Sequence, residues 1–217
     1  METRRKFLKN GLLFSLAAGT LVSTGCARHP FKTTSGHQWA MIIDLNRCTG
    51  CQSCVIACKL QTHTAQNCFN TQIIEKETGG FPASRVVFTP LQCQHCENPP
   101  CVSACPQQAT FKLANGIVVT DWSRCIADGA CVDACPYGVR FPDPRFGNRV
   151  DKCDFCIDRL RQGLVPACVE ACAPGARIWG DLNHPTGEFA EYLKAGGLSS
   201  LKPELGLKAR VLYKTIG

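Results

Sequence analysis

The sequence predicts an α+β protein, rich in loops, whose two similar halves enclose inorganic cores in place of one large apolar core. Three observations predict this class. The 217 residues include 17 cysteines but only 8% aromatic residues, so few large side chains are present to fill an ordinary core. The 19 glycines and 13 prolines are typical of a chain with many turns. An internal repeat divides most of the chain into two parts of the same organisation.

The first 27 residues are predicted to be an export signal that takes no part in the fold. Arg4 and Arg5 form a twin-arginine pair, and a short apolar run from Gly11 to Val22 follows. That run is too short to cross a bilayer as an ordinary helix, which needs about 20 apolar residues. The pattern indicates a twin-arginine signal peptide, a type that carries folded proteins and so allows a cofactor to be inserted before export.

Cys26 leaves two routes of processing open. Residues 23–26 resemble a lipoprotein cleavage box, although Ser23 stands where an aliphatic residue is expected, and residues 25–27 also offer a small-x-small site for ordinary cleavage. We expect a periplasmic protein, peripheral to the membrane and either lipid-anchored at Cys26 or released. Much of the net charge of +7 lies in this leader, and the remainder is too mild to indicate a nucleic-acid partner.

The predicted domain organisation after the leader rests on the internal repeat. Residues 43–48 (IDLNRC) match residues 120–125 (TDWSRC), and a short apolar run precedes each copy. We expect one domain over residues 38–180, made of repeats at about 40–116 and 117–180, and a C-terminal arm at 181–217.

Strands in this chain are predicted to be short, at residues 40–45, 71–76, 85–89, 117–120 and 208–213. One helix is expected at residues 186–195, because Gly196 and Gly197 end it. Single helical turns are expected after Cys54, Cys101, Cys131 and Cys168.

Four dense motifs account for 15 of the 17 cysteines, two in each repeat. The first is C-T-G-C-Q-S-C-V-I-A-C, with Cys48, Cys51, Cys54 and Cys58. The second is C-Q-H-C-E-N-P-P-C-V-S-A-C, with Cys93, Cys96, Cys101 and Cys105. The third is C-I-A-D-G-A-C-V-D-A-C, with Cys125, Cys131 and Cys135. The fourth begins C-D-F-C and ends A-C-V-E-A-C, with Cys153, Cys156, Cys168 and Cys172.

The spacing C-x-x-C-x-x-C wraps three thiolates around three irons of one cubane-type cluster. A fourth cysteine, three residues later, begins a helical turn that faces away, so it reaches the other cluster of a pair, as in two-cluster bacterial ferredoxins. Zinc sites use two spaced cysteine pairs and have no use for a run of three. Exported proteins do carry disulfides, but cysteines three residues apart are poor partners for each other. The motifs therefore indicate iron–sulfur clusters and electron transfer.

Asp128 departs from this pattern. Cys125 and Cys131 keep the length of the three-cysteine run, and Asp128 aligns with Cys51 of the first motif, so one ligand is replaced. A carboxylate is a harder and weaker ligand than a thiolate for the iron of such a cluster. The site is expected to hold either a [3Fe–4S] centre with that corner empty, which we prefer, or a [4Fe–4S] centre whose last iron is ligated by Asp128.

Two further residues stand close to or outside these motifs. Cys68 belongs to no motif and is expected to be a packed or surface thiol. His95 lies between Cys93 and Cys96, and it is expected either to tune the neighbouring cluster through a hydrogen bond or to face solvent.

The four motifs, in this order, resemble those of the four-cluster iron–sulfur subunits of the dimethyl sulfoxide reductase superfamily, and the resemblance covers residues 38–215. Within the superfamily the iron–sulfur subunits of tetrathionate reductases are most similar, and those of nitrite, thiosulfate, polysulfide and arsenate reductases are similar too. The stretches that carry it include AMIIDLNRCTGCQSC, ENPPCVSACPQQATF, NGIVVTD and LVPACVEACAPGARIWGDL.

The resemblance implies that the first motif pairs with the fourth, and the second with the third. It implies four ligand sets, which we call sets 1 to 4. Set 1 is Cys48, Cys51, Cys54 and Cys172; set 2 is Cys153, Cys156, Cys168 and Cys58. Set 3 is Cys93, Cys96, Cys101 and Cys135; set 4 is Cys125, Cys131 and Cys105, with a gap or Asp128 at the last iron.

The resemblance also implies a fold and a role. The fold is two ferredoxin-like halves related by a pseudo-twofold axis and built around four iron–sulfur clusters. The role is that of a non-catalytic subunit, which passes single electrons between a membrane quinol-oxidising subunit and a molybdopterin catalytic subunit. The alternative is a free periplasmic polyferredoxin, but the modest charge and the C-terminal arm favour a stable subunit of a hetero-oligomer.

Overall fold

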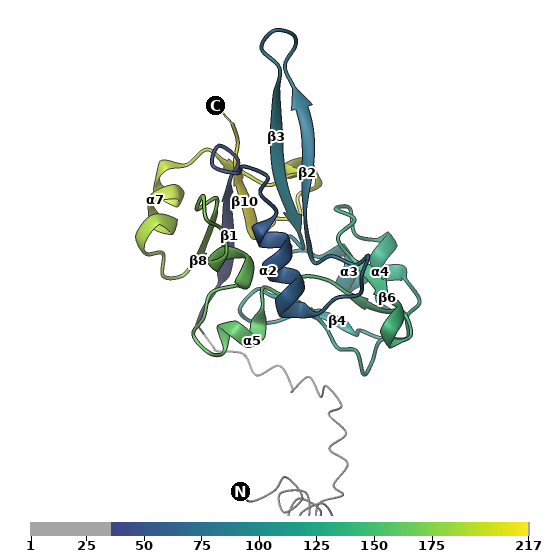
Figure 1. Ribbon diagram of the computed structural model, residues 1–217. Helices are drawn as coiled ribbons and strands as arrows, with labels where there is room; N and C mark the ends of the chain where they lie inside the picture. Colours follow the sequence, from purple (N-terminus) through teal and green to yellow (C-terminus); the bar gives the residue numbers. More distant parts are fainter. Residues whose placement is uncertain (1–35, 217) are drawn as a thin grey trace, which may run out of the picture. The chain divides into compact units, whose positions relative to one another are not determined.

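A four-stranded sheet draws together segments from both ends of the chain in the computed structural model, which describes residues 36–216 (Figure 1). The strand order is β8 (Arg177–Asp181), β1 (Trp39–Asp44), β10 (Val211–Lys214) and β9 (Leu198–Ser199). β1 runs parallel to β10 and antiparallel to β8. Residues 40–43 of β1 are fully buried, as expected of an inner strand with both faces covered.

One face of this sheet carries an apolar core of the first half, by which we mean the part of the fold that holds the first and fourth motifs. The helix α7 (Gly187–Ala195) packs Phe189 against Ala40, Ile42 and Ile178. Gly180 makes this contact possible, because a Cβ atom there would lie 2.2 Å from the Phe189 ring. The sheet thereby fixes β1 and β8, and these strands lead into the first motif and out of the fourth.

The first motif continues into α2 (Ser53–Thr62), the longest helix of the described residues. Cys54 and Cys58 are both buried on it, one turn apart, and the short helix α6 (Ala167–Glu170) of the fourth motif packs beside it. The helix ends where His63 adopts a left-handed conformation and donates its N–H to the Lys59 carbonyl. Another short helix, α5 (Ile157–Leu160), follows Cys156.

A long hairpin rises beside the first motif (Figure 1). Its strands, β2 (Thr71–Thr78) and β3 (Arg85–Gln92), pair in antiparallel register, with Thr71 opposite Gln92 and Thr78 opposite Arg85. Near the middle of β3, opposite Glu75, the Phe88 ring lies over Gly50 of the first motif. The hairpin thus anchors one cysteine loop and extends outward from it.

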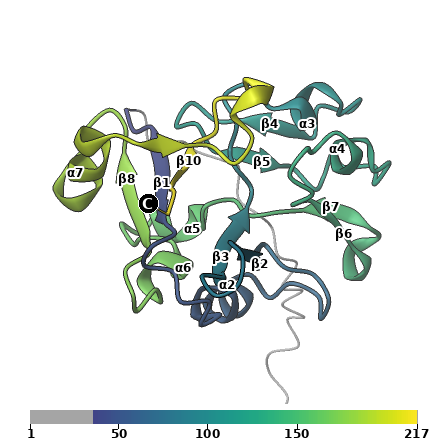
Figure 2. The same ribbon diagram turned by 90° about the horizontal axis from the view of Figure 1, so that it is seen from above.

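The second half, the part of the fold that holds the second and third motifs, is built from smaller pieces. Figure 2 shows them on the side away from β1 and β8. The one-turn helices α3 (Pro100–Ser103) and α4 (Ala130–Asp133) pack together beside two two-stranded sheets. The sheets pair β4 (Thr110–Lys112) with β5 (Val118–Thr120), and β6 (Phe141–Asp143) with β7 (Arg149–Asp151). Two 3₁₀ turns, η1 (Pro144–Phe146) and η2 (Pro203–Leu205), complete the described chain.

The observed elements agree with most of the predicted ones. The strands expected at 40–45, 71–76, 85–89 and 117–120 are β1, β2, β3 and β5, and the expected helix at 186–195 is α7. Residues 208–213 form a strand only from Val211 onward. The single turn expected after Cys54 was wrong, because α2 runs for ten residues without a glycine or proline to interrupt it.

The fold class is mixed, with short helices and small sheets that are consistent with ferredoxin-like binding domains. The pseudo-twofold axis and the domain boundaries remain predictions. The predicted leader at residues 1–27, with Cys26, lies outside the residues that the structure describes.

Candidate iron–sulfur centres

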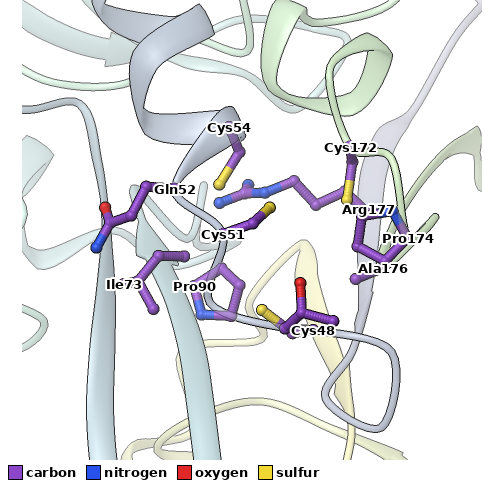
Figure 3. Close-up of a pocket in the computed structure, with 11 residues that line it drawn as sticks. Cys48, Cys51, Gln52, Cys54, Ile73, Pro90, Cys172, Pro174, Ala176 and Arg177 are labelled. Carbon is purple, nitrogen blue, oxygen red and sulfur yellow. The ribbon is translucent and has the colours of Figure 1, made fainter.

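Set 1 surrounds a single cavity (Figure 3). Cys48 and Cys51 come from the loop between β1 and α2, Cys54 lies in the first turn of α2, and Cys172 follows α6. Figure 3 shows their side chains pointing toward the same space as the guanidinium of Arg177. The four predicted ligands are therefore brought together from motifs more than a hundred residues apart in the sequence.

The backbone of this loop explains how one short segment presents three thiols to one space. Gly50 and Gln52, on either side of Cys51, both have left-handed conformations, with φ of 69° and 64°. A side chain at Gly50 would collide with Phe88, because its Cβ atom would lie 2.5 Å from the ring. Glycine is required at this position for both reasons.

Set 3 surrounds a second cavity of the same kind. Its four cysteines, from the second and third motifs, line this cavity together with Tyr137 and Arg140. Burial and the neighbouring Cys93 and Cys101 thiols raise the pKa of Cys96 to about 12. A thiol in this state is protonated at neutral pH until a metal displaces the proton.

Three of the four thiols of set 2 are buried, those of Cys58, Cys153 and Cys168. Burial raises the pKa of Cys153 well above its usual value, and the nearby Cys58, Cys168 and Cys156 thiols raise it further. Burial is also the main cause that raises the pKa of Cys58 and that of Cys156, the latter to about 12. The four thiols of set 2 are thus close enough to influence one another electrostatically, as ligands of one centre would be.

Set 4 brings together the three remaining motif cysteines. Burial raises the pKa of Cys131, Arg140 opposes this, and the Cys105 and Cys125 thiols add to the increase. Asp128 is exposed on the loop between Cys125 and Cys131. An open hollow lies against this loop and is lined by residues 125–127 and 145–147 and Arg149.

The backbone of the third motif repeats that of the first. Ala127 and Gly129 flank Asp128 with φ of 60° and 80°, where Gly50 and Gln52 flank Cys51 with 69° and 64°. The residue before the second cysteine position is left-handed in the other two motifs as well, at His95 and Phe155. Asp128 therefore occupies the position at which the first motif has its second cysteine.

His95 does not face solvent, which settles one of the two expectations for it. The ring is fully buried, and its Nδ1 accepts a hydrogen bond of 3.0 Å from the Val118 N–H. Burial, with the charges of Lys152, Arg140 and Arg210, lowers its pKa well below the usual value, so the ring is neutral and Nε2 carries the proton.

The ring of His95 also joins two sets. It packs on Phe155 with a distance of 3.8 Å between ring centroids. His95 stands between Cys93 and Cys96 of set 3, and Phe155 stands between Cys153 and Cys156 of set 2. Sets 2 and 3 therefore adjoin across the boundary between the halves, and the two residues occupy equivalent places in their motifs.

Two buried arginines were not identified from the sequence. Arg177 lines the cavity of set 1 and lies 3.7 Å, from Nη1 to Sγ, from Cys168 of set 2. Arg140 lines the cavity of set 3 and hydrogen-bonds to Cys131 of set 4. The sequence carried one signal for them, because each arginine follows the last cysteine of its motif, Cys135 or Cys172, by five residues.

Buried donors without acceptors make these cavities suitable for inorganic clusters. Among the described residues, Arg177 Nε, Arg140 Nη2, Tyr137 Oη and His95 Nε2 are buried without a hydrogen-bond partner. Such donors are costly to bury unless an acceptor is supplied. The sulfides and thiolates of iron–sulfur clusters are acceptors, so the residues present fit such a group.

The remaining cysteine chemistry is simple in the part of the chain that the structure describes. All sixteen cysteines in residues 36–216 are free thiols. Cys68 lies outside the four sets, with its Sγ 3.9 Å from the Pro142 carbonyl oxygen.

No three His, Cys, Asp or Glu side chains in this region converge as ligands of a single metal ion would. Nor does any helix within it have the length and apolar character needed to span a membrane.

Comparison with known proteins gives the same chemistry. A family model described as a 4Fe-4S dicluster domain matches residues 84–182, and one described as a 4Fe-4S binding domain matches residues 39–60. A tetrathionate reductase subunit from Salmonella typhimurium is 42% identical over 98% of this chain and 88% of that protein. A tetrathionate reductase subunit from Archaeoglobus fulgidus is 38% identical over 94% of this chain and 95% of that protein. The thiosulfate reductase electron transfer subunit of Salmonella typhi is 43% identical over 68% of this chain and 78% of that protein.

Proposed function

The chain belongs to the 4Fe–4S electron-transfer subunits of dimethyl sulfoxide reductase family complexes, and from that premise we propose that it relays electrons between a membrane quinol-oxidising subunit and a molybdopterin catalytic subunit. It is an electron-transfer subunit rather than a catalytic one. The observation that carries the proposal is the succession of contacts between the cysteine sets. Arg177 touches sets 1 and 2, His95 and Phe155 join sets 2 and 3, and Arg140 touches sets 3 and 4.

Each set is assigned one cluster, with [4Fe–4S] in sets 1 to 3. A bound cluster takes up and gives back one electron at a time. The protein's contribution is to hold four thiolates at sets 1 to 3 and three at set 4, to bury three of the four thiols of set 2, and to place buried donors beside the sites. Cys51 differs from the deeply buried thiols, because it is exposed and hydrogen bonds from Ser53 lower its pKa. Set 1 is therefore the proposed site of electron exchange with a partner at one end of the relay.

Set 4 is assigned a [3Fe–4S] centre. Asp128 occupies the second ligand position, and its exposed carboxylate binds iron more weakly than a thiolate does. Oxidised protein should then give a near-isotropic electron paramagnetic resonance signal of about one spin per chain. Asp128→Cys should remove this signal and yield a fourth [4Fe–4S] cluster. An aspartate-ligated four-iron cluster would instead show the signal only after mild oxidation.

The substrate of the whole complex is proposed to be tetrathionate. The support is the 42% identity to a tetrathionate reductase subunit over nearly the whole chain. The thiosulfate reductase subunit, at 43% identity over a shorter stretch, makes thiosulfate the nearest alternative, and nitrite, polysulfide and arsenate reductases stay open as well.

Purification and kinetics of the native complex test the relay. The affinity-tagged chain, isolated anaerobically from detergent-solubilised membranes, should bring with it a molybdenum-containing subunit and a membrane subunit. Quinol-driven reduction of tetrathionate should require this chain, whereas a viologen dye that reduces the catalytic subunit directly should not. A chain that purifies alone with its clusters would favour the free polyferredoxin.

Export by the twin-arginine route to the periplasm is proposed from residues 1–27 alone. Replacing Arg4 and Arg5 with lysine should leave the precursor, with its clusters loaded, in the cytoplasm. Cys26→Ser should abolish membrane anchoring of the isolated chain if Cys26 is lipidated and leave it unchanged if ordinary cleavage occurs. Unchanged export of the lysine variant would remove the twin-arginine assignment.

A further inference from the structure

Arg177 and Arg140 are equivalent in the two halves. Each follows the last cysteine of its motif by five residues, and each is almost fully buried, at 3% and 4% exposure. Each donates a hydrogen bond to a threonine hydroxyl, Arg177 to Thr71 at 2.8 Å and Arg140 to Thr110 at 3.2 Å. The correspondence between the third and fourth motifs thus extends beyond the cysteines themselves.

Arg177 is fixed between sets 1 and 2. Its Nη1 donates to the Gln92 side-chain oxygen at 3.2 Å and lies 3.7 Å from the Cys168 sulfur of set 2. It also hydrogen-bonds to Cys54 of set 1, whose cavity it lines. An arginine guanidinium keeps its proton throughout the physiological pH range, so Arg177 places a permanent positive charge between the two sets.

Arg140 has the same place between sets 3 and 4. It lines the cavity of set 3 and hydrogen-bonds to Cys131 of set 4. Its guanidinium is likewise a permanent positive charge. Cys131 and Cys168, the sulfurs that the two arginines approach, are themselves equivalent cysteines of the third and fourth motifs.

A buried guanidinium needs compensation, and here it comes from the ligand sets. Among the described residues, the acceptors near the two arginines are hydroxyl, amide and sulfur atoms, and neither arginine has a carboxylate partner. Other arginines do: Arg47 pairs with Glu188, and Arg210 with Glu97. A cation that is left unpaired beside thiolates interacts most strongly with the charge that resides there.

We propose that Arg177 and Arg140 set the reduction potentials of the relay, each cation lying between the two clusters of one half and raising the potentials of both. The proposal rests on the assignment of clusters to the four sets. An added electron makes a cluster more negative, so a fixed positive charge beside it favours the reduced form. Because each arginine serves one half, the two halves are tuned separately.

Redox titration of the full chain with its clusters, monitored by electron paramagnetic resonance, tests this. Arg177→Gln and Arg140→Gln each remove one cation. In each variant two of the four clusters should show at least a tenfold fall in the equilibrium constant for reduction, which is about 59 mV for a one-electron couple. The two clusters whose potentials change in one variant should keep their wild-type potentials in the other variant. Each variant is therefore the matched control for the other.

Lysine variants separate charge from structure. Arg177→Lys and Arg140→Lys keep the cation but lose the planar fork of donors. They should retain iron and sulfide and change each equilibrium constant by much less than tenfold. If a glutamine variant loses its clusters, the lysine variant at the same position is the test. A tenfold or larger fall in the equilibrium constant for reduction in that lysine variant would contradict a role for charge.

Two other outcomes would overturn the proposal. One is a pair of glutamine variants with full iron and sulfide content whose potentials match the wild type. The other is an equal shift of all four clusters in either variant, as expected from a general loosening of the fold. A wild-type chain without iron and sulfide would overturn the proposed function as well. A wild-type chain that contains its clusters, with potentials that neither glutamine substitution changes, would overturn only this proposal.

Discussion

The two halves of the molecule hold their cysteine sets by different means. The half with sets 1 and 2 rests on the four-stranded sheet, whose core of Ala40, Ile42, Ile178 and Phe189 contains no cysteine. The half with sets 3 and 4 has only two-stranded sheets, and its buried cluster consists of Cys101, Val118, Cys131 and Val150. Half of that second core is made of predicted cluster ligands.

This difference shows where the clusters serve as structure as well as redox centres. Two-stranded sheets are marginal by themselves, and small domains without a sufficient core need metals or cross-links. In the second half the clusters are expected to supply the missing interior. In the first half the four-stranded sheet, in which β1 pairs with the distant β10, is expected to persist without the clusters.

Removing the clusters should give the largest effect. After treatment with a chelator and an oxidant under denaturant-free conditions, β4, β5, β6 and β7 should lose protection from hydrogen exchange, because their core loses its inorganic part. The amides of β1, β8 and β10 should keep much of theirs. Mass spectrometry of peptides from the two halves measures this, and a uniform loss of protection would erase the distinction between them.

Phe189→Ala should weaken the first half selectively. The ring is 2% exposed and fills the space between β8 and α7, so its loss is expected to cost about 3–5 kcal/mol in the free energy of opening of that sheet. Hydrogen exchange in β8 measures the change. Phe81→Ala is the control, because that ring is 98% exposed at the hairpin tip and should matter by less than about 0.5 kcal/mol.

Gly50→Ala compares the equivalent loops of sets 1 and 4. The new methyl group would meet Phe88, so we expect the loop of residues 48–54 to open more easily by about 1–3 kcal/mol. Ala127 already has a side chain at the equivalent left-handed position, beside an open hollow. Ala127→Gly should therefore change the opening of its own loop by less than about 1 kcal/mol. Similar costs at both positions would show that Phe88 is not the reason for the glycine.

Much of this organisation could be predicted from the sequence, because cysteine spacing and apolar runs are local signals. The strands at residues 40–45 and 117–120 were found from consecutive aliphatic residues, and α7 from its glycine stop. The strands β4, β6 and β7 were missed, since three residues are too few to show an alternating pattern. β8 was missed because it takes its place only through pairing with β1, which is distant in the sequence.

The candidate site divides in the same way. The cysteines could be identified from their spacing, and the structure places those of set 1 around one cavity and those of set 3 around another. Arg140 and Arg177 share only a five-residue offset from the last cysteine of their motifs, and this offset was not enough to identify them, because a single arginine is usually a surface residue. Only their burial, together with their common offset from equivalent cysteines, reveals them.

The central claim is that four clusters occupy the two halves and that one of them lacks a thiolate at Asp128. Iron and acid-labile sulfide, measured per chain on anaerobically purified protein, test it most directly. We predict about 15 irons with about 16 sulfides, and about 16 irons in Asp128→Cys, from the stoichiometry of three [4Fe–4S] clusters and one [3Fe–4S] centre. Zinc in place of iron, with no acid-labile sulfide, would contradict the account.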